Sequence, residues 1–283
     1  MSTVLFCADP LTLSRVDQHF AAQARAVRDA GGTVALIDHD ALLAGDAAGA
    51  VRRVPRDLGP VWYRGWMVPT GRYGELCAAL AARGVAMRVG VADYRAAHEL
   101  PGWYAAFDGL TPRTVWTPWA PGRAPDVGTV AELVAPLGGG PAVVKDYVKS
   151  RKHEWAQACH VPELADPTAV ARVVARMVEL QGDDLAGGIV VRRFERFAGA
   201  EARVWWLDGA PVLTTAHPDT PAETVEPDLA GVAAAVARLG RRFVTTDLVR
   251  RDDGAWRVVE AGDAQVSDLP AGVDPARLLD RLR

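Results

Sequence analysis

Cysteine is scarce in this sequence. The three cysteines, Cys7, Cys77 and Cys159, are too few and too scattered for a disulfide framework or a zinc site. Their apolar or helical neighbours predict buried, reduced thiols. With 49% hydrophobic residues the composition is that of an ordinary globular protein, and 283 residues suffice for two or three packed units.

Long apolar runs and an excess of positive charge are also missing. No segment approaches the ~18 apolar residues of a membrane-spanning helix, and MSTVLFCADP (1–10) lacks the features of a signal peptide. A formal net charge of -3 disfavours binding to nucleic acid or a membrane surface, because both require a broad basic field. We therefore expect a cytoplasmic protein without such partners.

Strands and helices alternate in the first part of the chain. VLFCA (4–8) and TVALID (33–38) have the character of buried strands, and the helical pattern between them (11–30) ends at two glycines. This β-α-β order implies a parallel sheet, and residues 61–89 repeat it. We therefore predict a Rossmann-like α/β domain over residues 1–110.

The remainder of the chain changes character. A proline-rich connector leads to predicted helices, of which the longest (167–181) has Asp166 as its expected N-cap. Strands dominate the last third, and their Asp-Gly turns are typical of antiparallel hairpins. These patterns predict a central subdomain at residues 111–187 and a C-terminal subdomain at residues 188–283.

One segment concentrates positive charge. In PAVVKDYVKSRKHEW (141–155) a short strand-like run ends at Lys145, and four more basic groups follow. These are Lys149, Arg151, Lys152 and His153. A solvated loop is one interpretation, and a docking place for a strongly anionic ligand is the other.

The segment FVTTDLVRRDDGAWRVVEAGD (243–263) predicts a hairpin with two facing carboxylates. A two-residue type I′ turn at Asp253-Gly254 places Asp247 directly opposite Glu260, where like charges are destabilising. Three interpretations follow: a slipped register or exposed edge, a carboxylate dyad that shares a proton, or a pair that binds a divalent ion. The basic segment favours the third, because a magnesium–nucleotide complex needs both cations and carboxylates.

These features together resemble the ATP-grasp superfamily of ligases. The order of elements agrees from about Thr111 to Leu269, and the preceding β-α-β units look like that superfamily's usual N-terminal domain. The expected fold is therefore α/β and α+β, an ATP-grasp fold with an N-terminal Rossmann-like domain. Four motifs resemble a divergent clade that contains uncharacterised bacterial proteins and a eukaryotic assembly factor for a translation initiation complex. They are YRGWM (63–67), Tyr94…LPGWY, KSRKHEW and EAGDAQVSDLP.

The resemblance implies how phosphates are bound. Lys145 corresponds to the lysine that contacts the nucleotide phosphates, and Arg113 to an earlier basic residue on the phosphate side. Many family members cover the phosphates with a glycine-rich loop. Here Lys149, Arg151 and Lys152 take that place, and we expect them to form a mobile lid over the triphosphate.

The resemblance also implies an adenine site. VVRRF (190–194) corresponds to the adenine-binding hinge, where Phe194 packs on the base. Arg193 replaces the acidic residue often seen there, which puts the hinge contacts in doubt. Glu201 is the candidate for contacting the ribose or the substrate amine, with a plain surface position as the alternative.

Four residues near the C-terminus complete the implied site. Arg203 corresponds to the arginine that approaches the transferred phosphate, since a planar guanidinium suits phosphate oxygens. Asp247 and Glu260 match the metal-binding acids of the family's last hairpin. The usual third ligand is replaced by Gly262, and Asp263 is the proposed substitute.

Arg64 and Trp66 in YRGWM are the candidates for binding the second substrate. An arginine grips a carboxylate with two hydrogen bonds; closing a domain interface is the alternative role for both residues. His98, Trp103 and Tyr104 are interpreted as a packed corner.

The implied activity is ligation that depends on ATP and Mg²⁺. A carboxylate is activated as an acyl phosphate and joined to an amine of a small metabolite, a peptide or a protein. This chemistry requires no protein nucleophile, and the sequence has no G-x-S-x-G elbow, H-E-x-x-H helix or Walker A loop. No histidine is assigned a role. The alternatives are an ATP-binding assembly factor or chaperone with little catalytic activity, and a phosphotransferase that stops at the phosphorylated product.

Overall fold

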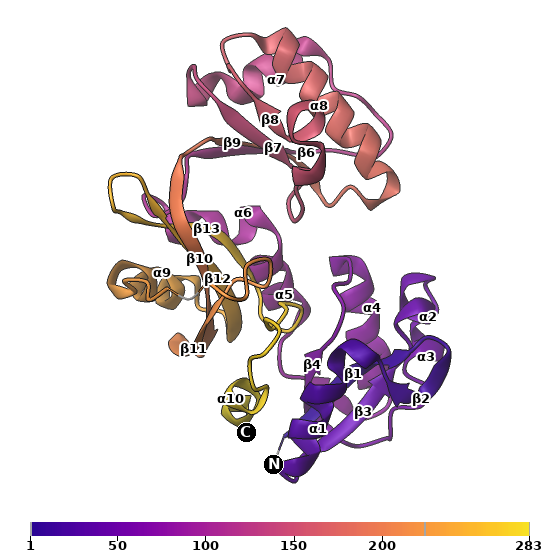
Figure 1. Ribbon diagram of the computed structural model, residues 1–283. Helices are drawn as coiled ribbons and strands as arrows, with labels where there is room; N and C mark the ends of the chain where they lie inside the picture. Colours follow the sequence, from indigo (N-terminus) through magenta and orange to yellow (C-terminus); the bar gives the residue numbers. More distant parts are fainter. Residues whose placement is uncertain (1, 224, 283) are drawn as a thin grey trace. The chain divides into compact units, whose positions relative to one another are not determined.

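The computed structural model describes residues 2–223 and 225–282 (Figure 1). The chain divides into two compact units. Unit 1 comprises Met1–Ala97, Ala200–Leu248 and Glu260–Arg283, and unit 2 comprises His98–Gly199 and Val249–Val259. The three-part division expected from the sequence stays a prediction.

The first sheet of unit 1 is parallel, as predicted. Strand β1 (Thr3–Asp9) pairs in parallel with β3 (Thr33–Ile37) and β4 (Gly59–Arg64), and β4 pairs in parallel with β5 (Val85–Met87). Its helices are α1 (Ala21–Asp29), α2 (His39–Leu43), α3 (Ala47–Ala50), α4 (Thr70–Ala81) and α5 (Val91–His98). The Rossmann-like character expected for this part of the chain is confirmed.

The first half of the helix predicted at 11–30 is wrong. Thr12–Val16 forms strand β2, which is antiparallel to β1, and α1 begins only at Ala21. The reason lies in Asp9, whose carboxylate accepts hydrogen bonds from the backbone amides two and three residues later. These bonds stabilise a tight turn in place of a helix start.

The second sheet of unit 1 has the strand order β11-β10-β12-β13. Its strands are β10 (Phe197–Leu207), β11 (Ala210–Ala216), β12 (Phe243–Arg251) and β13 (Trp256–Asp263), and the ends of β10, β12 and β13 extend into unit 2. Asp208 and Gly209 have positive φ (48° and 82°), as a two-residue type I′ turn between β10 and β11 requires. Helices α9 (Ala230–Leu239) and α10 (Ala276–Leu279) follow the strands.

Both sheets of unit 1 share one hydrophobic core. Trp205 of β10 and Phe243 of β12 are almost completely buried and belong to the same cluster as Leu5 of β1 and Tyr63 of β4. Arg64 lies over the Trp205 ring, 5.2 Å from its centroid. Because interiors of this kind are close-packed, the polar residues of the second sheet are held rigidly on the first.

The β12–β13 turn differs from the predicted two-residue turn. The Arg251 amide donates to the Ala255 carbonyl and the Gly254 amide donates to the Arg251 carbonyl, so the loop has three residues. Only its glycine has positive φ (87°), which spares an aspartate the left-handed conformation. At the other end of the hairpin, the Ala264 amide donates to Phe243, in the predicted register. The two ends of the ladder therefore differ by one residue.

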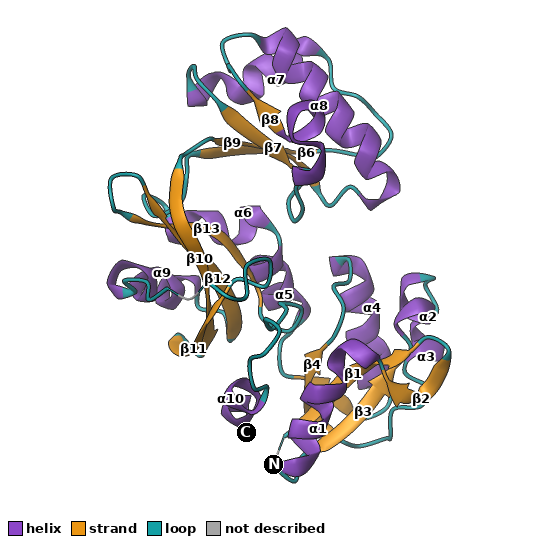
Figure 2. Cartoon of the chain, viewed as in Figure 1, coloured by secondary structure: helices purple, strands orange, loops and turns teal. Residues whose placement is uncertain are grey.

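Unit 2 contains a sheet of order β6-β9-β7-β8 with its own hydrophobic core (Figure 2). Its strands are β6 (Thr114–Pro118), β7 (Ala142–Lys145), β8 (His160–Val161) and β9 (Gly188–Arg193). Its helices are α6 (Leu100–Trp103), α7 (Val127–Val134) and α8 (Pro167–Gln181). Asp166 caps α8 by accepting hydrogen bonds from the next two non-proline amides, which confirms the predicted N-cap.

Single helical turns connect these elements. The 3-10 turns are Gln18–Phe20, Tyr104–Phe107, Ala135–Leu137, Lys152–Glu154, Gly182–Asp184 and Asp280–Leu282, and Trp155–Cys159 is a π-helix. Across the described residues, the structure contains no helix with both the length and the apolar surface needed to cross a bilayer.

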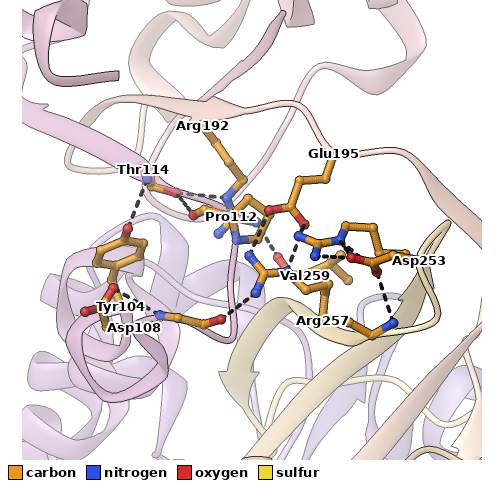
Figure 3. A network of polar contacts seen from close by, with 12 residues as sticks. Tyr104, Asp108, Pro112, Thr114, Arg192, Glu195, Asp253, Arg257 and Val259 are labelled. Atoms are coloured by element: carbon orange, nitrogen blue, oxygen red, sulfur yellow. Dashed lines mark hydrogen bonds and ion pairs between the residues drawn. The ribbon is translucent and has the colours of Figure 1, made fainter. Parts of the chain in front are cut away.

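A polar network ties the tip of the β12–β13 hairpin into unit 2 (Figure 3). Arg257 of β13 binds Glu195 through two hydrogen bonds of 2.8 Å, and both side chains are less than one-fifth exposed. Arg192 of β9 donates to the carbonyl oxygen of Val259. These contacts explain why Val249–Val259 clusters with unit 2 although the rest of the hairpin belongs to unit 1.

Gly188, the first residue of β9, has no room for a side chain. An added Cβ would lie 2.1 Å from the Thr117 carbonyl oxygen and 2.9 Å from Pro118 Cα, both on the paired strand. We expect Gly188→Ala to lower the free energy of unfolding by about 2 kcal/mol in urea titrations, because overpacking shifts the backbone. The control is Gly71→Ala in α4, where an added Cβ meets no atom within 4 Å. Equal stability of the two variants would contradict this account of the β6–β9 pairing.

Candidate functional site

An ion pair in the second sheet of unit 1 is the centre of the candidate site. Arg203 of β10 donates to Asp247 of β12 through Nε (2.7 Å to Oδ1) and Nη2 (2.8 Å to Oδ2). The Asp247 side chain is 4% exposed and that of Arg203 12%. Burial lowers the pKa of Arg203, but the carboxylates of Asp247, Glu260 and Glu201 outweigh this effect and raise it above its ordinary value. The guanidinium is therefore a fixed, permanent cation among acids.

The pairing of β10 with β11 adds two more groups to this ion pair. Arg203 lies opposite Thr215, and the His217 amide donates to the Glu201 carbonyl at 2.9 Å. Since alternate residues share one face of a strand, the three polar side chains face the same side. His217 Nε2 lies 3.1 Å from Arg203 Nη2 and 3.7 Å from Asp247 Oδ2. Among the described residues, ligand atoms of Glu201, His217 and Asp247 all lie within 4.8 Å of one another.

His217 has no role in the sequence-based prediction, although part of the signal is present. The Asp208-Gly209 turn indicates a β10–β11 hairpin, and counting from it places Ala216 opposite Glu201. The observed register shifts by one residue between Trp205 and Trp206. This irregularity brings His217 opposite Glu201, and the pattern of apolar residues does not reveal it.

Asp263, the predicted third metal ligand, is not brought to this group. Alternate residues of a strand point to opposite faces, so Asp263 and Glu260 point to opposite sides of β13. Asp263 is 1% exposed, and its Oδ1 accepts hydrogen bonds from the backbone and side-chain amides of Gln265 (2.9 and 3.1 Å). Burial raises the pKa of Asp263 to about 7. Glu260, in contrast, lies close enough to Arg203 to raise its pKa.

Unit 2 carries the predicted phosphate-binding lysine. Lys145 ends β7, is 8% exposed, and donates from Nζ to the Val148 carbonyl at 3.1 Å. The next residue, Asp146, is completely buried. It accepts hydrogen bonds from the amides of Val148 (2.7 Å) and Ala186 (3.2 Å) and from the Gln181 side chain (2.5 Å). Asp146 thus fixes the start of the basic loop, a role that the sequence-based prediction missed.

The other cations of the predicted lid lie on the surface of unit 2. Lys149 and Lys152 are exposed. Arg151 forms an ion pair of 2.8 Å with Glu154, in the 3-10 turn Lys152–Glu154. The structure therefore presents two lysine head groups to solvent, whereas Arg151 is engaged within the loop. Movement of this segment as a lid stays a prediction.

Phe194 belongs to an aromatic cluster on unit 2. Its ring meets Trp155 and His160 edge-to-face, at centroid distances of 6.0 and 5.6 Å. Trp155 stacks on His160 at 5.0 Å and is 42% exposed. The cluster offers a planar base an accessible aromatic surface beside the predicted hinge residue.

The two remaining predicted cofactor residues bind one 3-10 turn. Arg113 donates from Nη2 to the Pro136 carbonyl at 2.7 Å, and Arg193 donates from Nη1 to the Leu137 carbonyl at 3.5 Å. Both carbonyls belong to the turn Ala135–Leu137, which follows α7. The structure thus gives both arginines partners within unit 2, and their contact with a nucleotide stays a prediction.

Arg64 and Trp66, the predicted substrate residues, differ in exposure. Arg64 is 1% exposed and donates from Nη1 to the carbonyls of Gln265 (3.2 Å) and Ser267 (2.9 Å), so it holds the segment after β13. Trp66 is 40% exposed, and its ring lies 4.6 Å from that of His19. Of the pair, Trp66 presents a side chain to solvent, and Arg64 has an internal role.

The family of the chain follows from its sequence. Residues 136–282 match a family of ATP-grasp domains, the third family of its clade, and this match covers more than half of the chain. The chain therefore belongs to this ATP-grasp family, which confirms the resemblance to the superfamily. No curated protein matches the sequence.

Solved structures show the same fold at low identity. D-cycloserine synthetase DcsG aligns with a TM-score of 0.62 and 17% identity, covering 100% of both chains. An ATP-grasp RimK domain protein from Sphaerobacter thermophilus aligns with a TM-score of 0.60 and 16% identity over 99% of this chain and 98% of that chain. The ATP-grasp ligase PsnB, complexed with minimal precursor, Mg and ADP, gives 0.56 and 15% over 99% and 96%. These likenesses establish the fold, an ATP-grasp fold with a Rossmann-like N-terminal sheet.

The pKa of Asp263 predicts a pH-dependent stability. It is about 7 in the folded protein against an ordinary value of 3.8, so between these values the folded state binds more protons than the unfolded chain. The stabilisation is therefore complete below pH 3.8 and is lost as the pH rises through 7. Between pH 5 and 8 we expect the wild type to lose on the order of 2 kcal/mol more unfolding free energy than Asp263→Asn.

Urea unfolding at pH 5, 6, 7 and 8 measures this difference. Asp29→Asn, which changes an exposed aspartate of α1 in the same unit, is the control and should follow the wild type. Parallel pH profiles for the wild type and Asp263→Asn would show that this carboxyl is ionised in the folded protein.

Proposed function

We propose that the chain is a ligase that uses ATP and Mg²⁺ to activate a carboxylate as an acyl phosphate and join it to an amine. The observation that carries the proposal is the buried Arg203–Asp247 pair, with Glu260 and Glu201 close to it, in a member of an ATP-grasp family. A permanent cation beside acids supplies the two kinds of charge that phosphoryl transfer requires. Two of the similar structures are described as a D-cycloserine synthetase and an ATP-grasp ligase, which also supports the proposal.

The donor set suits a magnesium–nucleotide complex. Mg²⁺ is usually held by one or two carboxylates together with substrate phosphates, and Asp247 and Glu260 are the proposed carboxylates. Bound there, the ion would neutralise charge on the phosphate oxygens. Lys145 and the exposed Lys149 and Lys152 are proposed to bind the same phosphates, since ammonium groups form short charge-assisted hydrogen bonds with them.

Aromatic residues are proposed to bind the uncharged parts of the ligands. The exposed face of Trp155, next to Phe194, packs on the adenine ring. Trp66, on the first sheet of unit 1, lies near the carboxyl end of the parallel strand β4. Ligands of open α/β sheets bind at this edge, so Trp66 is proposed to contact the second substrate.

The reaction has two steps, and the residues of the chain position and neutralise in both. First a carboxylate oxygen attacks the γ-phosphorus, the bond from that phosphorus to the ADP oxygen breaks, and ADP leaves. Arg203 binds the oxygens of the transferred group. The amine nitrogen then attacks the acyl carbon, the carbon–nitrogen bond forms, and inorganic phosphate leaves as the carbon–oxygen bond breaks. The nitrogen releases its proton to solvent.

Calorimetric titration with ATP tests the nucleotide site. We expect the wild type to bind ATP with Mg²⁺ and to bind it at least about tenfold more weakly without the ion, because the ion neutralises the phosphates. Asp247→Asn/Glu260→Gln should abolish this metal dependence. Asp29→Asn/Glu75→Gln, which changes two exposed acids of the same unit, should retain it.

The appearance of ADP in the presence of carboxylates and amines then separates the possible activities. Release of ADP that requires both a carboxylate and an amine supports the ligase. Release with a carboxylate alone indicates a phosphotransferase, and metal-dependent binding without release across a broad panel indicates an ATP-binding assembly factor. A folded wild type that does not bind ATP would overturn the proposal.

A further inference from the structure

The imidazole of His217 is an unexpected component of the acidic group in unit 1. Glu201 and His217 face each other across the β10–β11 ladder, and Asp247 approaches from β12. One nitrogen and two carboxylate oxygens, one from each residue, lie within 4.8 Å of one another. Imidazole is a ligand of first-row transition ions, whereas Mg²⁺ prefers oxygen donors. The composition of the group therefore differs from that of an all-carboxylate magnesium site.

Arg203 shows that a cation is accommodated among these three side chains. Its Nη2 lies 2.8 Å from Asp247 Oδ2 and 3.1 Å from His217 Nε2. A guanidinium can only donate hydrogen bonds, so its contact with the ring is favourable when Nε2 carries a lone pair. That lone pair then points into the group, where a metal ion would be bound.

The other ring nitrogen of His217 has two possible partners. Nδ1 lies 3.2 Å from the backbone nitrogen of Asp219, a donor, and 3.9 Å from its carboxylate Oδ2. A neutral imidazole accepts at one nitrogen only, so it cannot accept from both Arg203 and the Asp219 amide. When Nε2 is the acceptor, Nδ1 carries the proton, and the Asp219 carboxylate is the group to receive it. A carboxylate in this position is the usual partner of a metal-bound histidine.

We propose that Glu201, His217 and Asp247 form a divalent-metal site that binds a first-row transition ion such as Mn²⁺ more tightly than Mg²⁺. Arg203 occupies the position of the ion in the metal-free chain and leaves Asp247 when the ion binds. The displaced guanidinium is then available to the transferred phosphate. This inference rests on the proposed function for its role in catalysis, but the site itself is defined by the residues of unit 1.

Titration of the full chain with Mn²⁺ in the absence of nucleotide tests the proposal. Free Mn²⁺ is measured by its electron paramagnetic resonance signal, and Mg²⁺ affinity by competition. The wild type is expected to bind one Mn²⁺ with a Kd at least about tenfold lower than that for Mg²⁺. His217→Gln should remove this preference, while His39→Gln, a histidine of the same unit outside the group, should retain it. Unfolding curves establish that each variant is folded.

Arg203→Gln provides a second, independent readout. Because Arg203 and the ion compete for Asp247, removal of the guanidinium should lower the Kd for Mn²⁺. Equal wild-type affinities for the two ions, or a preference that persists in His217→Gln, would overturn the site. A Kd that is unchanged or raised in folded Arg203→Gln would overturn the competition.

The result is distinguishable from the outcome of the ATP titration. Metal-dependent ATP binding without a His217-dependent preference for Mn²⁺ would leave the ligase proposal intact and overturn the metal site. A His217-dependent Mn²⁺ site in a chain that does not bind ATP would support the metal site and overturn the ligase proposal.

Discussion

The ion pair between Arg203 and Asp247 organises one face of the second sheet in unit 1. It joins the neighbouring strands β10 and β12, and Arg203 also donates to the Asp268 carbonyl at 3.2 Å, which anchors the segment after β13. Removing one partner of a buried pair leaves an uncompensated charge and typically costs about 3–5 kcal/mol. The positions of Glu201 and His217 matter for the same reason, since both surround this pair. A residue proposed to act on phosphate and a residue proposed to bind metal are thus held by each other.

Unit 2 solves a different problem, which is to expose cations at a defined place. Lysine head groups are costly to bury, and Lys149 and Lys152 remain on the surface. The loop that carries them is defined from below by Asp146, a buried carboxylate with backbone and side-chain donors around it. Accepting several hydrogen bonds stabilises such a buried acid. A rigid start of the loop and exposed charge further along it are therefore compatible.

Much of this architecture could be predicted from local patterns. The parallel sheet follows from alternating apolar strands and helices, and the Asp166 cap follows from its position before Pro167. Asp247 is singled out because the predicted hairpin places it opposite a second acid, which a sheet without a use for the pair would avoid. The family resemblance, confirmed by the match over residues 136–282, adds Lys145 and Arg203, whose places at a strand end and beside Asp247 are now visible.

Other features depend on interactions that local patterns do not contain. His217 reaches Glu201 through a one-residue register shift, and strand β2 replaces helix because of side-chain bonds from Asp9. Asp263 is close to Glu260 in sequence, but the alternation of a strand sends the two side chains to opposite faces. Arg64 is held by carbonyls about two hundred residues away. Such contacts are set by the tertiary fold.

A double-mutant cycle on Arg203→Gln and Asp247→Asn, measured by urea unfolding in metal-free buffer, is the most direct test of the central claim. If the pair organises the site, the two substitutions are strongly coupled, with an interaction free energy of about 2 kcal/mol. Effects that add within about 0.5 kcal/mol would contradict the claim and show that the two residues act independently.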